Sequence, residues 1–68
     1  MNLIIYDKYM ELWIARDKVG ELRLYNEKPI KETTWFYCEG RSLLLYDNLF
    51  PEVTFENSPQ RVKIELIK

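Results

Sequence analysis

The acidic side chains are the first candidates for catalysis, because acid–base chemistry uses two carboxyl groups at a controlled separation with different pKa values. The carboxylates considered for that role are Asp7, Asp17, Asp47 and Glu52. They lie far apart in the sequence, and no spacing makes two of them a pair. Asp17 and Asp47 stand at expected turns, where an aspartate commonly bonds its own backbone. We therefore interpret them as structural and predict no catalytic residue.

Nucleophilic and metal chemistry are limited by what the chain contains. It has no histidine and a single cysteine, Cys38, so its own residues supply neither a Ser-His or Cys-His couple nor an intramolecular disulfide or thiolate cluster. Cys38 stands between Tyr37 and Glu39, which do not activate a thiol, and we expect a buried structural cysteine. A Ser-Lys arrangement stays open, although no spacing indicates one. We predict a non-enzymatic protein with no metal and no cofactor.

Aromatic residues point instead to binding. The chain has two Trp, five Tyr and three Phe, and Trp, Tyr and Arg are enriched at binding hot spots. Residues 34–37 follow a polar, proline-containing stretch and predict an exposed apolar patch. We predict a partner-binding surface made of Trp35, Tyr37, Lys28 and Lys31. The competing interpretation is that Trp35, and still more Trp13, belongs to the core, because a tiny domain needs large side chains to bury enough area.

Two further functions stay open beside a protein-binding surface. Arg23 and Tyr25 share a strand face with Trp13, as in small barrels that bind single-stranded nucleic acid with cations and stacking rings. Glutamates are interleaved with the cations, however, and ten basic against eleven acidic residues give a net charge of −1, which weakens any attraction to phosphates. The other alternative is a structural homo-oligomer that buries its second sheet face against a copy of itself.

Alternating hydrophobic residues predict a β-hairpin in the first half of the chain. Residues 10–16 and 21–25 alternate with period two, as strands with one buried face do. The intervening Asp17-Lys18-Val19-Gly20 suits a type I turn with Gly20 at positive φ. This turn predicts that Trp13 faces Tyr25 and that Ile14 faces Leu24.

The second half is read as loops and shorter strands. Residues 26–34 are expected to form a loop, and residues 35–38 and 42–46 a second hairpin around Glu39-Gly40. The three leucines at 43–45 fit a buried strand or a helix equally well. Residues 53–55 are a short strand candidate. Residues 61–66 alternate apolar and charged side chains, as at a protected sheet edge. Residues 2–8 predict either a short strand or a turn.

Length and strand spacing together indicate the fold class. Sixty-eight residues of 8.3 kDa, 47% hydrophobic and 31% charged, predict a single small domain over residues 1–68. Short strands about ten residues apart predict an all-β antiparallel meander of about five strands, either a strongly bent sheet or an SH3-like barrel. The apolar run at residues 3–6 is too short for a signal peptide or a membrane span, and a cytoplasmic location is expected.

Two segments carry a resemblance to other proteins. Residues 13–25 with Lys28-Pro29 follow a WIARDKxGxLxLYxxKP pattern, and residues 49–59 read LFPEVTFENSP. Both patterns resemble short uncharacterised proteins of Bacteroides-type gut bacteria and of their phages or mobile elements. The resemblance covers about residues 13–66 and implies a small standalone protein of mobile-element origin. It carries over no catalytic residue. The expected function is a binding protein that presents a surface to a macromolecular, above all protein, partner such as a host protein that it modulates.

Overall fold

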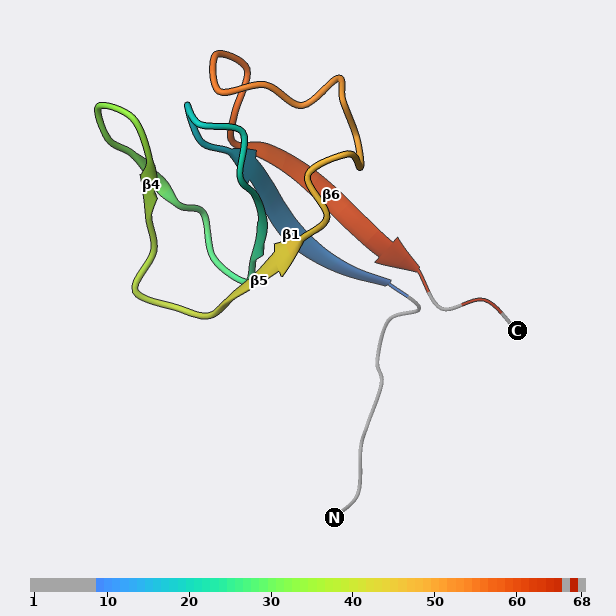
Figure 1. The fold of residues 1–68 in the computed structure, drawn as a ribbon. Coiled ribbons are helices and arrows are strands. Elements are labelled where there is room, and N and C mark those ends of the chain that lie inside the picture. Colours follow the sequence, from blue (N-terminus) through green and yellow to red (C-terminus); the bar gives the residue numbers. More distant parts are fainter. Residues whose placement is uncertain (1–8, 66, 68) are drawn as a thin grey trace.

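The computed structural model describes residues 9–65 and residue 67, and it is all-β (Figure 1). The expectation for residues 2–8 lies outside the described residues. Six strands form two antiparallel sheets, and no helix occurs in the described part. The larger sheet has the order β5-β2-β1-β6, with β5 Ser42–Leu45, β2 Leu22–Tyr25, β1 Tyr9–Arg16 and β6 Gln60–Glu65. The smaller sheet, a ribbon, pairs β3 (Ile30–Lys31) with β4 (Phe36–Tyr37).

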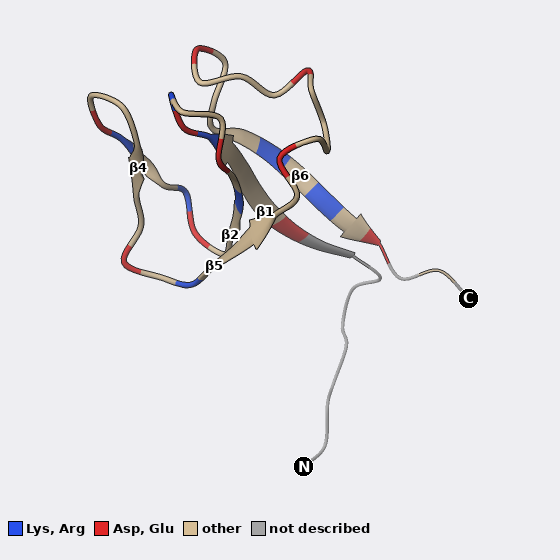
Figure 2. Ribbon diagram, in the orientation of Figure 1, with Lys and Arg blue, Asp and Glu red and all other residues tan. Residues whose placement is uncertain are grey.

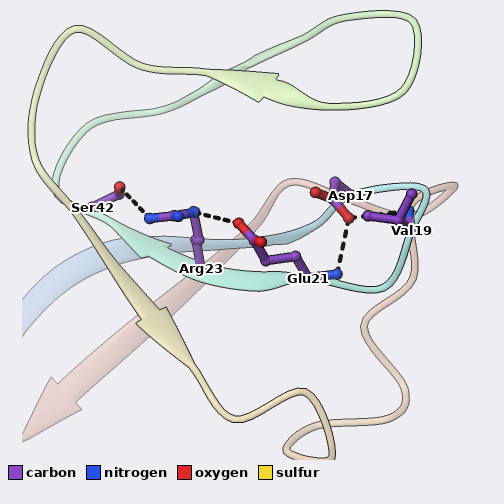
Figure 3. A network of polar contacts seen from close by, with 5 residues as sticks. All are labelled: Asp17, Val19, Glu21, Arg23 and Ser42. Carbon is purple, nitrogen blue, oxygen red and sulfur yellow. Dashed lines mark hydrogen bonds and ion pairs between the residues drawn. The ribbon is translucent and has the colours of Figure 1, made fainter.

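The β1–β2 hairpin confirms the expected register and turn. Trp13 pairs with Tyr25 and Ile14 with Leu24, and Gly20 has a φ of 99°. Glycine adopts that conformation without the steric cost that a Cβ would add. Figure 3 shows Asp17 Oδ1 accepting hydrogen bonds from the backbone N–H groups of Val19 (3.1 Å) and Glu21 (2.9 Å). The Asp17 carboxylate is therefore a turn cap, as its position in the sequence predicts.

The second predicted hairpin is wrong, because its two halves pair with other segments. Strand β5 lies antiparallel to β2, with Leu43 opposite Leu24, and β4 lies antiparallel to β3. Gly40 is not the tip of a tight hairpin: a Cβ there would collide with the side chain of Asn26. That side chain accepts a hydrogen bond from the N–H of Arg41 at 2.8 Å and so guides the chain onto the edge of β2.

Two smaller expectations for the second half also fail. The polar stretch 26–34 contains the strand β3 rather than being loop throughout. Residues 53–55 form no strand and instead belong to successive turns. The N–H of Val53 donates to the carbonyl of Phe50 at 2.9 Å. The N–H of Ser58 donates to the carbonyl of Phe55 at 3.3 Å. The expected edge strand near the C-terminus is confirmed over Gln60–Glu65, paired only with β1.

Each face of the four-stranded sheet has its own small apolar cluster. On one face Ile14 and Leu22 pack with Val53 from the 46–59 loop. On the other face Ala15 and Tyr25 pack with Phe36 from the β3–β4 ribbon. Figure 1 shows the ribbon and the loop leaving the sheet at different places, and the rings of Phe36 and Phe55 join the two segments. The described strands do not close into a barrel, since β5 and β6 remain sheet edges.

The Arg16 guanidinium holds the loop cover in place. Its three nitrogens donate to five backbone carbonyl oxygens at 2.6–3.2 Å, those of Val53, Gly20, Asp47, Leu49 and Phe50. The N–H of Arg16 also donates to Ser58 Oγ at 3.0 Å.

Within the described residues, no helix is long and apolar enough to cross a bilayer.

Candidate protein-binding surface

The β3–β4 ribbon is a small, firmly attached projection. At its tip the N–H of Glu32 donates to the carbonyl of Trp35 at 2.8 Å, which closes a tight turn. The N–H of Lys18 donates to the carbonyl of Thr34 at 2.9 Å and ties this tip to the β1–β2 turn. Two backbone links therefore fix the ribbon tip, which its two-residue strands could not hold alone.

The inner side of the ribbon attaches to the domain through aromatic rings. Phe36 is only 7% exposed, and its ring meets that of Phe55 edge-on with centroids 5.7 Å apart. Lys31 pairs with Phe36 across the ribbon. Its Nζ lies 4.6 Å from the Phe55 centroid and donates to the carbonyl of Glu56 at 3.3 Å. Lys31, expected in the partner-binding surface, lies on the inner side of the ribbon, where its exposed side chain helps to attach the ribbon.

The outer side carries three large apolar side chains, Ile30, Trp35 and Tyr37, which we call the ribbon face. They are 60%, 50% and 41% exposed. Ile30 lies directly opposite Tyr37, and the Trp35 and Tyr37 rings meet edge-on with centroids 6.3 Å apart. Trp35 is thus not a core residue. Trp13 is partly buried and packs against the Ala15, Tyr25 and Phe36 cluster.

A hollow beside the ribbon face adds one of the expected lysines. Its volume is about 310 Å³, and its lining residues are Glu27, Lys28, Ile30, Tyr37, Cys38 and Glu39. Lys28 therefore lies near Tyr37 and Ile30, although its Nζ also lies 5.4 Å from the Trp13 ring centroid. Cys38 is half-buried rather than fully buried, with its thiol 3.7 Å from the Glu27 carbonyl.

The structure brings together three of the four expected site residues and adds one that sequence reasoning missed. Trp35, Tyr37 and Lys28 gather around the ribbon face, whereas Lys31 points to its other side. Ile30 was missed because it sits in a polar stretch next to Pro29, with no alternation to mark a strand. Only its pairing with Tyr37 reveals the contact.

The residues of the nucleic-acid alternative are engaged within the protein. Tyr25 is 6% exposed, so neither face of its ring is open for a base. Burial raises the pKa of its phenol, and the nearby Arg23 cation opposes that shift. Arg23 donates to Glu21 Oε1 at 2.8 Å and to Ser42 Oγ at 3.2 Å (Figure 3). Figure 2 shows acidic and basic residues interspersed along the described chain.

The chemical capacity of the ribbon face is to bury apolar area against another surface. Among the described residues, no three His, Cys, Asp or Glu side chains are grouped so that they could hold a metal ion. Comparison with protein-family models, with curated proteins and with solved structures finds no match for this chain. We therefore infer the function from the ribbon face and from the sequence patterns at residues 13–29 and 49–59.

Proposed function

We propose that this protein is a non-enzymatic binding protein that presents the ribbon face to a protein partner. The observation that carries the proposal is the grouping of Ile30, Trp35 and Tyr37, each at least two-fifths exposed, on one side of a two-stranded ribbon. Apolar area removed from water contributes about 25 cal/mol per Å². Adjacent exposed rings are therefore an energetic reason for a partner to dock.

The attachment of the ribbon supports the proposal as well. Phe36 and Lys31 hold its inner side against Phe55, and the N–H of Lys18 holds its tip. The outer rings are thus presented on a fixed support before a partner arrives. Preorganisation of this kind lowers the entropic cost of ordering side chains on binding.

The surroundings of the ribbon face define the chemistry of the partner. Its centre is apolar, and the adjoining hollow carries Lys28 together with Glu27 and Glu39. The partner surface that fits is an apolar patch whose rim carries both positive and negative charges. Combined with the resemblance to mobile-element proteins, this leads us to propose a host protein, modulated by occupancy of one of its own surfaces.

The test is affinity capture from a lysate of Bacteroides-type cells, with and without nuclease, followed by mass spectrometry. We expect one specific protein to be captured in both conditions, and we expect Trp35→Ala to lose it at least tenfold. Truncation of a hot-spot residue costs about 2 kcal/mol or more, which exceeds a tenfold change in affinity. The matched control is Tyr46→Ala, since Tyr46 is 80% exposed and lies outside the ribbon.

Three results would contradict the proposal. Undiminished capture by a folded Trp35→Ala variant would remove the ribbon face from the interaction. Unfolding of that variant, seen as loss of its near-ultraviolet circular dichroism, would make Trp35 a structural residue. Recovery that disappears with nuclease would favour the single-stranded nucleic-acid alternative instead, and such binding would weaken steeply with salt.

A further inference from the structure

The two edge strands of the four-stranded sheet differ in how they are protected. Strand β6 carries Arg61, Lys63 and Glu65, all exposed, along its length. Charges of this kind discourage an edge from pairing with another chain. Strand β5 reads Ser-Leu-Leu-Leu and carries no charge. In Figure 2 strand β5 is tan throughout, the colour of uncharged residues, whereas β6 has blue and red segments.

The backbone of β5 has hydrogen-bonding groups directed away from the sheet. The N–H of Asn26 donates to the carbonyl of Arg41, so Arg41 turns its backbone groups toward β2. Backbone directions alternate along a strand, and Leu43 and Leu45 therefore also face β2. The N–H and C=O of Ser42 and Leu44 point outward, where the described chain places no further strand.

Strand β5 presents leucine side chains on both faces of the sheet. Leu43 and Leu44 are 60% and 55% exposed, and Tyr46 immediately after the strand is 80% exposed. Leu43 and Leu45 lie on the same face as their pairing partners Leu24 and Leu22. Leu44 lies on the opposite face, beside Arg23. An edge of this composition is a template for strand addition.

We propose that β5 pairs with β5 of a second copy of this chain, antiparallel, about a two-fold axis at Leu44. In a symmetric antiparallel pair with the axis perpendicular to the sheet, the outward groups of Leu44 exchange two hydrogen bonds with Leu44 of the partner subunit. Leu43 then lies opposite Leu45 of the partner subunit. The four-stranded sheet of each copy continues into that of the other.

The sequence that flanks β5 indicates that the strand paired with its open edge comes from a second copy of this chain. Arg41 precedes the uncharged residues 42–46, and Asp47 follows them. The proposed register, continued past the ends of β5, brings Arg41 near Asp47 of the partner subunit, which lies in the turn that follows the strand. The symmetric Asp47–Arg41 pair forms at the other end of the interface. A strand flanked by a cation before it and an anion after it is complementary in charge to its own antiparallel copy. No ion pair of either side chain is found within the described residues.

This inference is independent of the proposed function. The dimer uses the outer edge of β5, whereas the ribbon face consists of Ile30, Trp35 and Tyr37 on β3 and around β4. It also differs from an oligomer that stacks one sheet face on another. Such a stack would use Ile64, which is 50% exposed and lines an apolar hollow with Leu24, Leu45 and Phe50 on the face covered by the loop.

The test is analytical ultracentrifugation of the full chain over a concentration series. We expect a reversible dimer of twice 8.3 kDa, and we expect Leu44→Lys to weaken it at least a hundredfold, because like charges would meet at the axis. The matched control is Ile64→Lys on β6, which should leave dimerisation unchanged. Ile64 is 50% exposed, against 55% for Leu44. A monomer at every concentration, or a dimer broken by Ile64→Lys and not by Leu44→Lys, would overturn the proposal.

A charge-exchange cycle tests the register with surface residues only. Arg41→Glu alone and Asp47→Lys alone should each weaken the dimer about tenfold, since each places like charges at both ends of the interface. The double variant Arg41→Glu/Asp47→Lys should restore the original affinity. If it fails to restore it while remaining folded, the antiparallel register about Leu44 is wrong. This cycle also decides the question if Leu44→Lys does not fold.

Discussion

The two segments that cover the sheet are held by different kinds of interaction. The β3–β4 ribbon attaches through rings: Phe36 clusters with Ala15 and Tyr25 of the sheet, and its ring also meets that of Phe55 from the 46–59 loop. The 46–59 loop contributes one buried apolar residue, Val53, to the opposite face. Most of its attachment is polar, because Arg16 bonds four carbonyl groups of the loop, together with that of Gly20.

This difference follows from the composition of the two segments. The loop alternates only over Val53-Thr54-Phe55, and its Leu49 and Phe50 are 39% and 49% exposed. Phe50 has a φ of 48°, a left-handed conformation that is unfavourable for a bulky side chain. A single guanidinium with five donors can satisfy several carbonyls and hold such a backbone. The ribbon is attached by its inner side chains, Phe36 and Lys31, and its outer rings stay exposed.

The largest expected effect is the loss of the ribbon's inner ring. Phe36→Ala should lower the free energy of unfolding by about 3 kcal/mol or more, because it removes a buried ring and leaves a cavity. The matched control is Trp35→Ala on the neighbouring, exposed position, which should cost less than about 1 kcal/mol. Urea denaturation measures both. Equal losses in the two variants would show that the ribbon's two sides are not energetically distinct.

Removal of the clamp should have the next largest effect. Arg16→Lys keeps the charge and most of the stem but cannot reach the same set of carbonyls, and we expect a loss of about 2 kcal/mol. Arg23→Lys is the matched control and should cost less than about 0.5 kcal/mol, since Arg23 bonds only two partly exposed side chains.

Amide hydrogen exchange would sharpen the same comparison locally. Arg16→Lys should accelerate exchange at Val53 more than at Glu32, whose N–H groups lie in the loop and the ribbon respectively. The milder Phe36→Leu variant should accelerate exchange at Glu32 more than at Val53. Uniform acceleration in both variants would mean that the two covers open together as one unit.

Alkaline pH should produce the smallest effect, and on the ribbon side alone. Burial raises the pKa of Tyr25 above its value of 10.0 in the unfolded chain. Its contribution to stability is therefore complete below about pH 10 and is lost as the pH rises from there through the folded-state pKa. The stability of Tyr25→Phe should fall less than that of the original chain between about pH 8 and about pH 11, and an equal fall would contradict this assignment.

The expectations from sequence succeeded where contacts are local. The hairpin from β1 to β2 was predicted with its register because Asp17 and Gly20 specify the turn, and alternation then places every partner. The edge position of β6 was likewise readable from its charged residues. Of the binding surface, the prediction included Trp35 and Tyr37 and did not include Ile30.

What only the tertiary structure decided is how the distant segments pair. Nothing local determines whether residues 42–45 return to β4 or extend β2. The outcome depends on the open edge of β2, on Asn26 meeting Arg41, and on the crowding of Gly40 against Asn26. The inward direction of Lys31 depends on Phe55, more than twenty residues away in the chain. Hydrophobic periodicity and turn chemistry act between near neighbours, whereas pairing across a sheet is settled by which edges and faces the whole chain leaves to be covered.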